Sequence, residues 1–383
     1  MSITHRVHVA ALAAIFAVSP LTAHAQAIIK VNDSTSIRFG FLAQMWADFQ
    51  QNARQDTSFA QSIFFRRMRF IASAQVGSKL SIFFQTDDPN LGRAAPGTNK
   101  NLAGATNGQG FIIQDAYIEL KPASAPVWVD AGLILIPLCR NCYASAASLL
   151  PIDYGAYSFL ASTPTGSVAG RDGGVMVKGT FADQHVEYRA GLFTGARATT
   201  GGAAPVTTAS NSFRGAGHLM VNFMETEAPG YVLPGTYLGR RKVFNVGAGF
   251  DVQSVYKAYA ADAFLSYPLG ANGVTLASTY IHYDGSTFFP TLARENTFEV
   301  EGGYHFTDAK ITPWVKWETR NIDAAFQTAA LQNEHRLQLG GTYYWVGQTL
   351  NVKAAYNRYT FKVLNASELS QNGFTVQLQA FYY

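Results

Sequence analysis

Residues 36–49 read SIRFGFLAQMWADF and alternate between apolar side chains and polar or small ones. The apolar positions are Ile37, Phe39, Phe41, Ala43, Met45, Ala47 and Phe49, and the positions between them include Arg38, Gly40, Gln44 and Asp48. Successive side chains of a β-strand point to opposite faces of its sheet. This stretch therefore predicts a strand with one apolar face and one polar face.

The same alternation recurs along the whole chain, in sixteen segments. Besides residues 36–49, these are residues 64–76, 80–87, 111–121, 127–136, 174–181, 185–193, 213–223, 242–252, 259–269, 274–284, 296–306, 311–320, 335–345, 350–359 and 373–383. Tight turns at residues 77–78, 122–126, 182–184, 270–273, 307–310 and 346–349 alternate with longer polar connections. The connection at residues 224–241 breaks this rule, because it is a long member of the short series.

An even number of amphipathic strands of about ten residues, with tight turns at one end and long loops at the other, is typical of an outer-membrane β-barrel. Hydrocarbon offers no partner to backbone N–H and C=O groups, so a sheet spans a membrane only when it closes on itself. A soluble β-sandwich would instead bury its apolar faces between two sheets. The sequence therefore predicts an all-β protein, a transmembrane antiparallel β-barrel of 16 strands.

The first 25 residues predict export. Arg6, an apolar run over residues 7–21 and the small residues of AHA (23–25) have the features of a secretory signal peptide, which leaves residues 26–383 as the barrel. Charged residues make up only 14% of the chain, and the net charge of +4 comes without a dense basic cluster. This composition argues against nucleic acid as a partner and favours contact with outer-membrane lipid.

The stretch FFRRMRF (64–70) places three arginines in the second predicted strand. Strict alternation turns Phe64, Arg66 and Met68 outward, with Arg66 at the rim, and turns Arg67 and Arg69 into the lumen. A guanidinium in a hydrated lumen suits carboxylate and phosphate groups, so these two residues predict a preference for anions.

The same parity predicts further charged residues in the lumen. The cations are Arg38, Lys121, Lys178, Arg189, Arg214, Lys316, Arg336 and Lys353, and the acids are Asp48, Asp87, Asp115, Glu119, Asp130, Glu187, Glu299, Glu301 and Glu318. Two interpretations are open: the cations line an anion path, or the mixture forms ion pairs across neighbouring strands.

The block FFRRMRF and the stretch QDAYIELK (114–121) resemble the arginine-rich second hairpin and the D-A-Y strand of the phosphate-selective porin O and P family. The resemblance implies a homotrimeric porin of the bacterial outer membrane, with a third extracellular loop folded into the lumen and basic residues along an anion path. It assigns the pathway arginines of that family to Arg67 and Arg69 alone.

The longest connection, residues 137–172, is the candidate for the infolded constriction loop. Its large apolar residues are Leu149, Leu150, Tyr154, Tyr157 and Phe159, and they favour packing against the barrel wall. Arg140 and Asp153 are expected to face the aperture, with Arg171 near its exit. The segment contains no lysine, which departs from the family pattern, so the expectation is a lean toward anions such as phosphate.

The loop also contains the only two cysteines, Cys139 and Cys142. In an oxidising compartment such a pair predicts a local disulfide. Haem attachment would need a histidine where Tyr143 stands, and no histidine lies at the usual spacing for a metal site. No hydrolase, zincin or phosphate-loop motif is present, so the sequence predicts neither an enzyme nor a cofactor.

The chain ends on FYY, which resembles the aromatic C-terminal strand of bacterial outer-membrane proteins. Phe381 and Tyr383 share a parity with Gln377 and Gln379, opposite the apolar face that contains Phe374. A bulge and an overhang of one residue are both open as explanations.

Taken together, these features predict a porin that lets small hydrophilic solutes diffuse passively, with a lean toward anions. The alternative is a barrel that sheathes a partner such as a periplasmic electron carrier. A sheath needs a wide bore, so the position of residues 137–172 separates the two interpretations.

Overall fold

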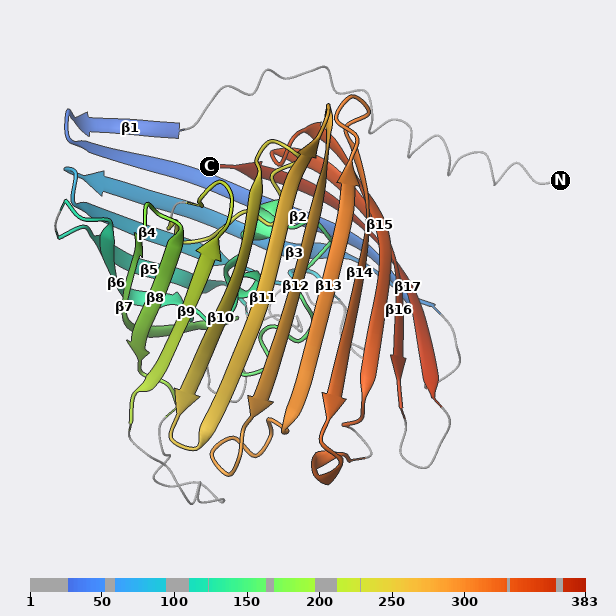
Figure 1. The fold of residues 1–383 in the computed structure, drawn as a ribbon. Coiled ribbons are helices and arrows are strands. Elements are labelled where there is room, and N and C mark those ends of the chain that lie inside the picture. Colours follow the sequence, from blue (N-terminus) through green and yellow to red (C-terminus); the bar gives the residue numbers. More distant parts are fainter. Residues whose placement is uncertain are drawn as a thin grey trace.

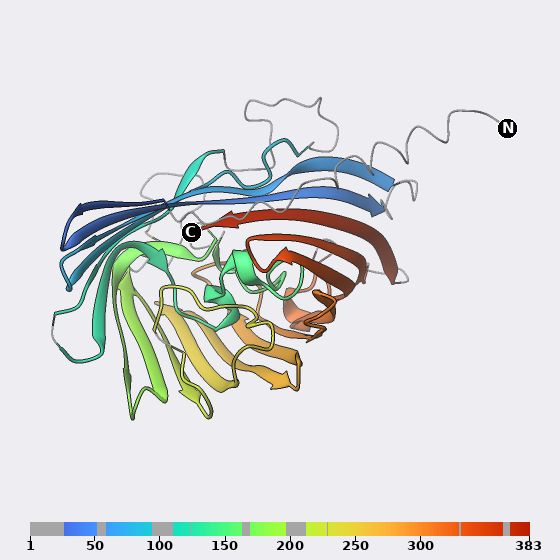
Figure 2. The ribbon, with the colours of Figure 1, turned by 90° about the horizontal axis from the view of Figure 1, so that it is seen from above.

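The computed structural model describes residues 27–51, 59–93, 110–122, 124–162, 169–196, 212–227, 229–328, 331–362 and 368–383. The predicted signal peptide lies outside these residues. Within them, sixteen antiparallel strands form a ring that closes by pairing of the last strand with β2 (Figures 1 and 2). The predicted barrel is confirmed.

The strands of the ring follow one another in chain order. They are β2 (Thr35–Gln51), β3 (Phe59–Val76), β4 (Leu80–Asp87), β5 (Ile112–Leu120), β6 (Val127–Leu135), β7 (Arg171–Phe181), β8 (Val186–Phe193), β9 (Arg214–Asn222), β10 (Val243–Gln253), β11 (Tyr256–Leu269), β12 (Asn272–Asp284), β13 (Glu295–His305), β14 (Ile311–Ile322), β15 (Glu334–Val346), β16 (Leu350–Phe361) and β17 (Leu369–Tyr382).

Shorter elements accompany the ring. Strand β1 (Ala27–Asn32) forms a hairpin with the start of β2, pairing with residues 35–39 beyond the end of β17. Single turns of 3-10 helix are η3 (Asn141–Tyr143), η4 (Ala146–Ser148) and η5 (Ala324–Phe326). None of the helices in the described ranges is long and apolar enough to cross a membrane.

The two ends of the ring differ in their connections. Most of the tight turns, such as the one after Val76, lie at the end where the C terminus lies (Figure 1). We call this the turn end and the opposite end the loop end. One connection at the loop end is shorter than the others: only Ser254 and Val255 separate β10 from β11.

The two faces of the strands have opposite chemistry. Leu276, Phe374 and Leu378 are among many large apolar side chains that are exposed on the outer face. Lys316 and Lys353 point inward and are at most 1% exposed. An apolar outer band with a polar interior is the arrangement that a closed sheet needs in lipid.

The parity of β3 changes at Arg66, where a β-bulge interrupts the pairing with β2. Gln44 pairs with Arg67 but Met45 pairs with Phe65, so Arg66 has no partner in the ladder. An extra residue in one strand reverses the facing of every residue beyond it. The predicted outward positions of Phe64 and Arg66 are therefore wrong.

Beyond the bulge, Phe64 is buried inside the barrel and packs against Trp46, with 5.9 Å between ring centroids. Arg66 turns toward the interior as well, where its Nε lies 2.9 Å from the Asp153 carboxylate. On the turn-end side of the bulge, Arg67 and Arg69 point inward as predicted.

The C-terminal strand shows no bulge. Its pairing with β2 runs without interruption from Gly373 to Tyr382. Tyr383 follows as an overhang of one residue, and its hydroxyl donates to Ser73 Oγ at 2.8 Å inside the barrel. Phe374 faces outward, whereas Phe381 and Tyr383 face inward. Both faces therefore belong to one regular strand, and its register is not shifted.

Two connections contact inward-facing side chains of the ring. We call residues 136–162, between β6 and β7, the inner loop, and residues 223–227 and 229–242, between β9 and β10, the inner turn. They contact each other directly: Leu233 N donates to Tyr143 O at 3.0 Å, and Ser145 N donates to Leu233 O at 2.7 Å. In Figure 2 the green inner loop, with its short helical turns, lies within the curve of the strands.

Candidate functional site

The inner loop is tied to the wall by two inward lysines, Lys316 of β14 and Lys353 of β16. Lys353 Nζ donates to the carbonyl oxygens of residues 149 and 151, at 2.5 and 2.7 Å. Lys316 Nζ donates to those of Asp153 and Tyr154, at 3.1 and 2.7 Å. An ammonium group has three donors and no acceptor, so each lysine satisfies backbone carbonyls that the loop leaves unpaired. Both lysines were predicted in the lumen.

Amide and phenol groups on other strands hold the same segment. Gln44 Nε2 donates to Ala146 O at 2.9 Å, and Gln379 Nε2 donates to Ala147 O at 2.8 Å. Tyr283 on β12 donates to the carbonyl of residue 157 at 2.9 Å. The inner loop is therefore held from several sides of the ring.

The apolar residues of the inner loop pack as their composition predicted. Leu149 and Leu150 are 2% and 0% exposed. Leu150 belongs to a cluster with Ile152 and Trp314 of β14. Their burial against the wall stabilises the position of the loop by removing apolar surface from water.

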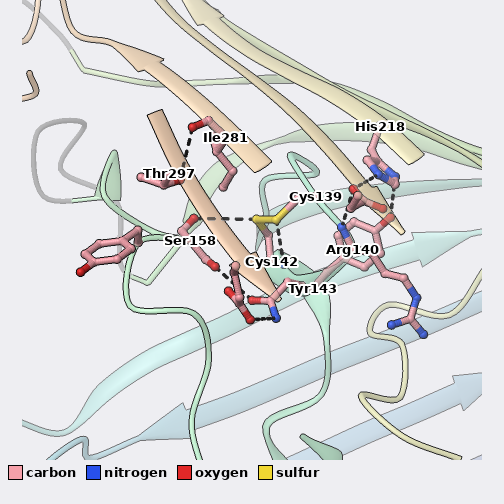
Figure 3. The surroundings of a disulfide bond; sticks show 12 residues. Cys139, Arg140, Cys142, Tyr143, Ser158, His218, Ile281 and Thr297 are labelled. Carbon is pink, nitrogen blue, oxygen red and sulfur yellow. Dashed lines mark hydrogen bonds and ion pairs between the residues drawn. A yellow bond between two sulfur atoms is a disulfide. The ribbon is translucent and has the colours of Figure 1, made fainter. Parts of the chain in front are cut away.

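Cys139 and Cys142 form a disulfide at the start of the inner loop (Figure 3). Next to it, the Tyr143 hydroxyl lies 2.6 Å from His218 Nδ1 on β9. His218 Nε2 in turn lies 2.8 Å from the carboxylate of Asp262 on β11. This chain of hydrogen bonds connects the loop to two strands of the wall.

Arg140 lies between the two inner segments and not in an open aperture, so that expectation is corrected. Its guanidinium is 3.4 Å from the centroid of the Phe264 ring and makes two hydrogen bonds to Glu227 of the inner turn, at 2.7 and 3.1 Å. Burial raises the pKa of Glu227, but the Arg140 charge and the hydrogen bonds to the carboxylate outweigh it and hold this pKa below its usual value.

The two arginines assigned to the pathway are both paired with acids. Arg67 lies 2.5 Å from Asp153 of the inner loop, and Asp153 also forms a salt bridge with Arg66. Arg69 lies 2.9 Å from Asp87 at the end of β4. Burial raises the pKa of Asp153, but its two arginines outweigh that effect and keep this pKa well below the usual range. The positive charge of β3 is therefore largely compensated.

The predicted cations on β7 to β9 all form ion pairs, across neighbouring strands for Lys178 and Arg214 and within β8 for Arg189. Lys178 lies 2.6 Å from Glu119 and 2.8 Å from Asp130, Arg189 lies 2.7 Å from Glu187, and Arg214 lies against Asp251 and 3.7 Å from Asp172. These three cations are at most 3% exposed. They stabilise the packed half of the interior and do not face open solvent.

Arg38 and Lys121 lie near the turn end and are half-buried. Arg38 is 5.4 Å from the centroid of the Tyr383 ring, and Lys121 Nζ is 5.3 Å from that of Trp128. Neither has a salt-bridge partner among the described residues. They are therefore predicted pore cations whose charge stays uncompensated by a close acid.

Three cavities follow one another along the side of the interior that the inner segments leave open. The first, the loop-end cavity, has a volume of about 570 Å³ and is bounded by β2, β3 and β14 to β17. The middle cavity, of about 250 Å³, lies between the inner loop and β3, β4, β5 and β7. The turn-end cavity, of about 580 Å³, is bounded by β2 to β6, the C terminus and both inner segments.

These cavities share lining residues in sequence. Arg66 and Asp153 line both the loop-end and the middle cavity. Arg69 and Arg171 line both the middle and the turn-end cavity. Tyr154 of the inner loop lines all three. The three cavities thus form a succession along one wall, past the pair of Arg67 and Asp153.

Arg171, expected near the exit of the loop, lies at the join of the middle and turn-end cavities, paired with Asp115 at 3.1 Å. Parity reasoning did not identify the arginines of the loop-end cavity as a group. They are Arg66, Arg93, Arg336 and Arg358. Arg93 is only 4.0 Å from Asp48, and within the described ranges neither Arg336 nor Arg358 has a salt-bridge partner.

The inner turn was also missed as part of the site. Its signal was its length, since residues 224–241 are a long connection in a series of tight turns. Nothing in its pattern says that it enters the barrel, because its contacts with the inner loop join residues about ninety positions apart.

No protein-family model and no curated protein matches the chain. Solved structures do match its fold. The outer membrane channel DcaP of Acinetobacter baumannii is 11% identical and aligns over 92% of this chain and 99% of its own, with a TM-score of 0.58. OmpF of Salmonella typhi, solved in complex with daunomycin, is 15% identical over 92% and 99%, with a TM-score of 0.55. OmpT of Vibrio cholerae is 12% identical over 93% and 100%, with a TM-score of 0.54. The chain is similar to these proteins in its barrel fold.

Proposed function

We propose that the chain is a porin through which small hydrophilic solutes diffuse passively. It would act in the bacterial outer membrane after residues 1–25 have been removed during export. The observation that carries the proposal is the succession of three cavities that share Tyr154. The apolar outer face and the likeness in fold to outer-membrane channels support the location. Diffusion through the lumen needs no catalytic residue and no cofactor.

The proposed selectivity is a weak preference for anions such as phosphate, set at the loop end. The loop-end cavity contains the four arginines Arg66, Arg93, Arg336 and Arg358 against the acids Asp48, Asp153 and Glu318. Deeper in the passage, Arg67, Arg69 and Arg171, which line the middle cavity, each have a close acid. A positive potential at the mouth raises the local concentration of anions, whereas paired charges along the path let both signs pass.

The contacts of the inner segments argue against the alternative of a sheath around a folded partner. The inner loop is bonded to inward side chains of β2, β12, β14, β16 and β17. The inner turn fills space beside it. We propose that the inner loop acts as the constriction. A homotrimer is part of the proposal, supported by the solution of OmpT of Vibrio cholerae in a trimer form.

Reconstitution in a planar bilayer tests the function. The purified chain should form open channels of steady conductance in potassium chloride, and a salt gradient should give a small reversal potential with the sign of anion preference. A chain that inserts into the bilayer, as judged by its protection from protease, but conducts no ions would overturn the proposal. A reversal potential with the sign of cation preference would overturn its anion lean alone.

A further inference from the structure

The turn-end cavity has the size and the chemistry of a ligand site. Its volume of about 580 Å³ lies within the range of small-molecule pockets. Its lining comes from parts of the chain that are distant in sequence: the wall strands, residues 144–147 of the inner loop, residues 229–232 of the inner turn and the C terminus. A general aqueous passage has no need of such a largely apolar lining.

Aromatic rings form a continuous surface in this cavity. Tyr231 of the inner turn stacks on Tyr117 of β5, with 4.4 Å between ring centroids. Phe83 of β4 lies 5.3 Å from Tyr117 and 6.3 Å from the ring of Tyr383 at the C terminus. Phe381 and Trp128 also line the cavity. Stacked and edge-to-face arrangements are those that a further aromatic ring would join.

The Tyr231 ring is fixed in place before any ligand arrives. Its hydroxyl accepts a hydrogen bond from Leu135 N at 3.0 Å and donates to the Asp115 carboxylate. Two bonds in different directions remove rotational freedom from the side chain. A preorganised aromatic surface reduces the entropy that binding would cost.

The charges around this cavity are balanced in pairs. Arg171 is paired with Asp115, Glu119 with Lys178, and Arg69 with Asp87. A charged ligand would lose its hydration here without gaining an unpaired counter-charge. The remaining polar groups of the lining are neutral, among them the Ser73 and Ser81 hydroxyls and the Gln85 amide. Each of these three already makes a hydrogen bond within the protein and keeps further capacity to donate or accept one from a ligand.

We infer that the turn-end cavity binds an uncharged aromatic solute that carries hydroxyl groups, such as a phenol or an aryl alcohol. The inference rests on the proposed channel function, because the solute reaches the cavity through the lumen. Its ring packs against the aromatic surface of Tyr231, Phe83 and Tyr383, and its hydroxyl groups contact the neutral polar side chains. The site gives the channel a place where such solutes dwell before they leave at the turn end.

The experiment uses resorcinol as the probe, with the full mature chain in detergent and saturation-transfer difference NMR as the readout. Two matched compounds separate the chemistry: 1,3-cyclohexanediol has the same hydroxyl groups without the aromatic ring, and 3-hydroxybenzoate has the ring with a negative charge. Resorcinol should bind saturably. The dissociation constants of both matched compounds should be higher than that of resorcinol by a factor of at least about two to ten.

Two variants locate the binding. Tyr231→Ala removes the ring of the inner turn, and Phe83→Leu keeps a wall residue of similar bulk if the first variant does not fold. Each should weaken resorcinol binding by about two- to tenfold. Tyr237→Phe is the control, because Tyr237 lies in the same inner turn, bonds Glu227 and does not line the cavity; its binding should equal that of the wild type.

The outcomes separate this inference from the proposed function. Equal binding of resorcinol and 1,3-cyclohexanediol, equal or tighter binding of 3-hydroxybenzoate, or unchanged binding in a folded Tyr231→Ala or Phe83→Leu variant would each overturn the inference. If the same preparations still conduct potassium chloride in a bilayer, the porin proposal survives that result. If the chain conducted no ions but still bound resorcinol, the porin proposal would be overturned and the binding site in the turn-end cavity would remain supported.

Discussion

The Arg67 guanidinium lies 2.5 Å from the Asp153 carboxylate and so ties β3 to the inner loop at the middle of the passage. The same arginine lies 5.2 Å from the centroid of the Tyr154 ring, the residue common to all three cavities. Any solute that passes between the loop-end and turn-end cavities meets this group, so it is the place where charge substitutions should act most strongly.

Neutralising both pathway arginines should shift selectivity toward cations. Arg67→Gln together with Arg69→Gln leaves Asp153 and Asp87 with less compensation, so the passage gains net negative charge. A unit charge a few ångströms from an ion acts with about 1 kcal/mol even in water, which corresponds to a change of about fivefold in the permeability ratio. Reversal potentials across a salt gradient measure it. Lys257→Gln, at an exposed residue of β11, is the control, and an unchanged ratio in the double variant would make the two arginines ordinary wall residues.

The opposite substitution should have the opposite sign. Asp153→Asn removes the acid that compensates Arg66 and Arg67, so the ratio of anion to cation permeability should rise. Because the amide keeps the size of the side chain, the barrel should remain folded, as judged by circular dichroism. A shift of Asp153→Asn toward cations would contradict the position of this residue in the passage.

Loss of Lys353 should loosen the inner loop without unfolding the barrel. Lys353→Met leaves two loop carbonyls without their donor, which costs roughly 1–3 kcal/mol for each buried group that water does not reach. The expected result is a larger and noisier single-channel current with the strand content unchanged. Lys257→Met serves as the matched control. A current identical to that of the wild type would mean that the loop is held by its other contacts.

The acid anchors of the inner loop should withstand mildly acidic pH. The pKa values of Asp153 and Glu227 lie below their usual values, so their contribution to stability is fully present above the ordinary carboxyl pKa and is lost only as pH falls through the lowered values. Between pH 7 and 5 the difference in conductance between wild type and Asp153→Asn should stay constant, and it should shrink only well below pH 4. Convergence of the two proteins near pH 5 to 6 would contradict this.

Reducing the bond between Cys139 and Cys142 should change channel noise more than stability. The cysteines are three residues apart, so the bond closes a very short loop and constrains the unfolded chain little. The ladder of the barrel does not depend on it. Current fluctuations before and after treatment with a reductant, compared with the midpoint of thermal unfolding, test this. A large fall in the midpoint with unaltered noise would be the contrary result.

Period-two alternation was enough to predict the closed barrel and its strands, because each strand must satisfy lipid on one side and water on the other. It also placed Arg67, Arg69, Lys316 and Lys353 on the inner face, since parity is a local property of a strand. The large apolar side chains within residues 137–172 predicted that this loop packs against other residues, because such side chains need burial wherever the loop lies.

Only the tertiary structure decided which inner charges meet. The bulge at Arg66 reversed the facing of Phe64, and strict alternation could not place it, because a bulge arises from the pairing with β2. Arg140 meets Glu227 because the inner turn enters the barrel from the opposite end. The sequence thus determined the wall, through a repeating local pattern, whereas the passage was decided by contacts between distant segments whose paths no local pattern specifies.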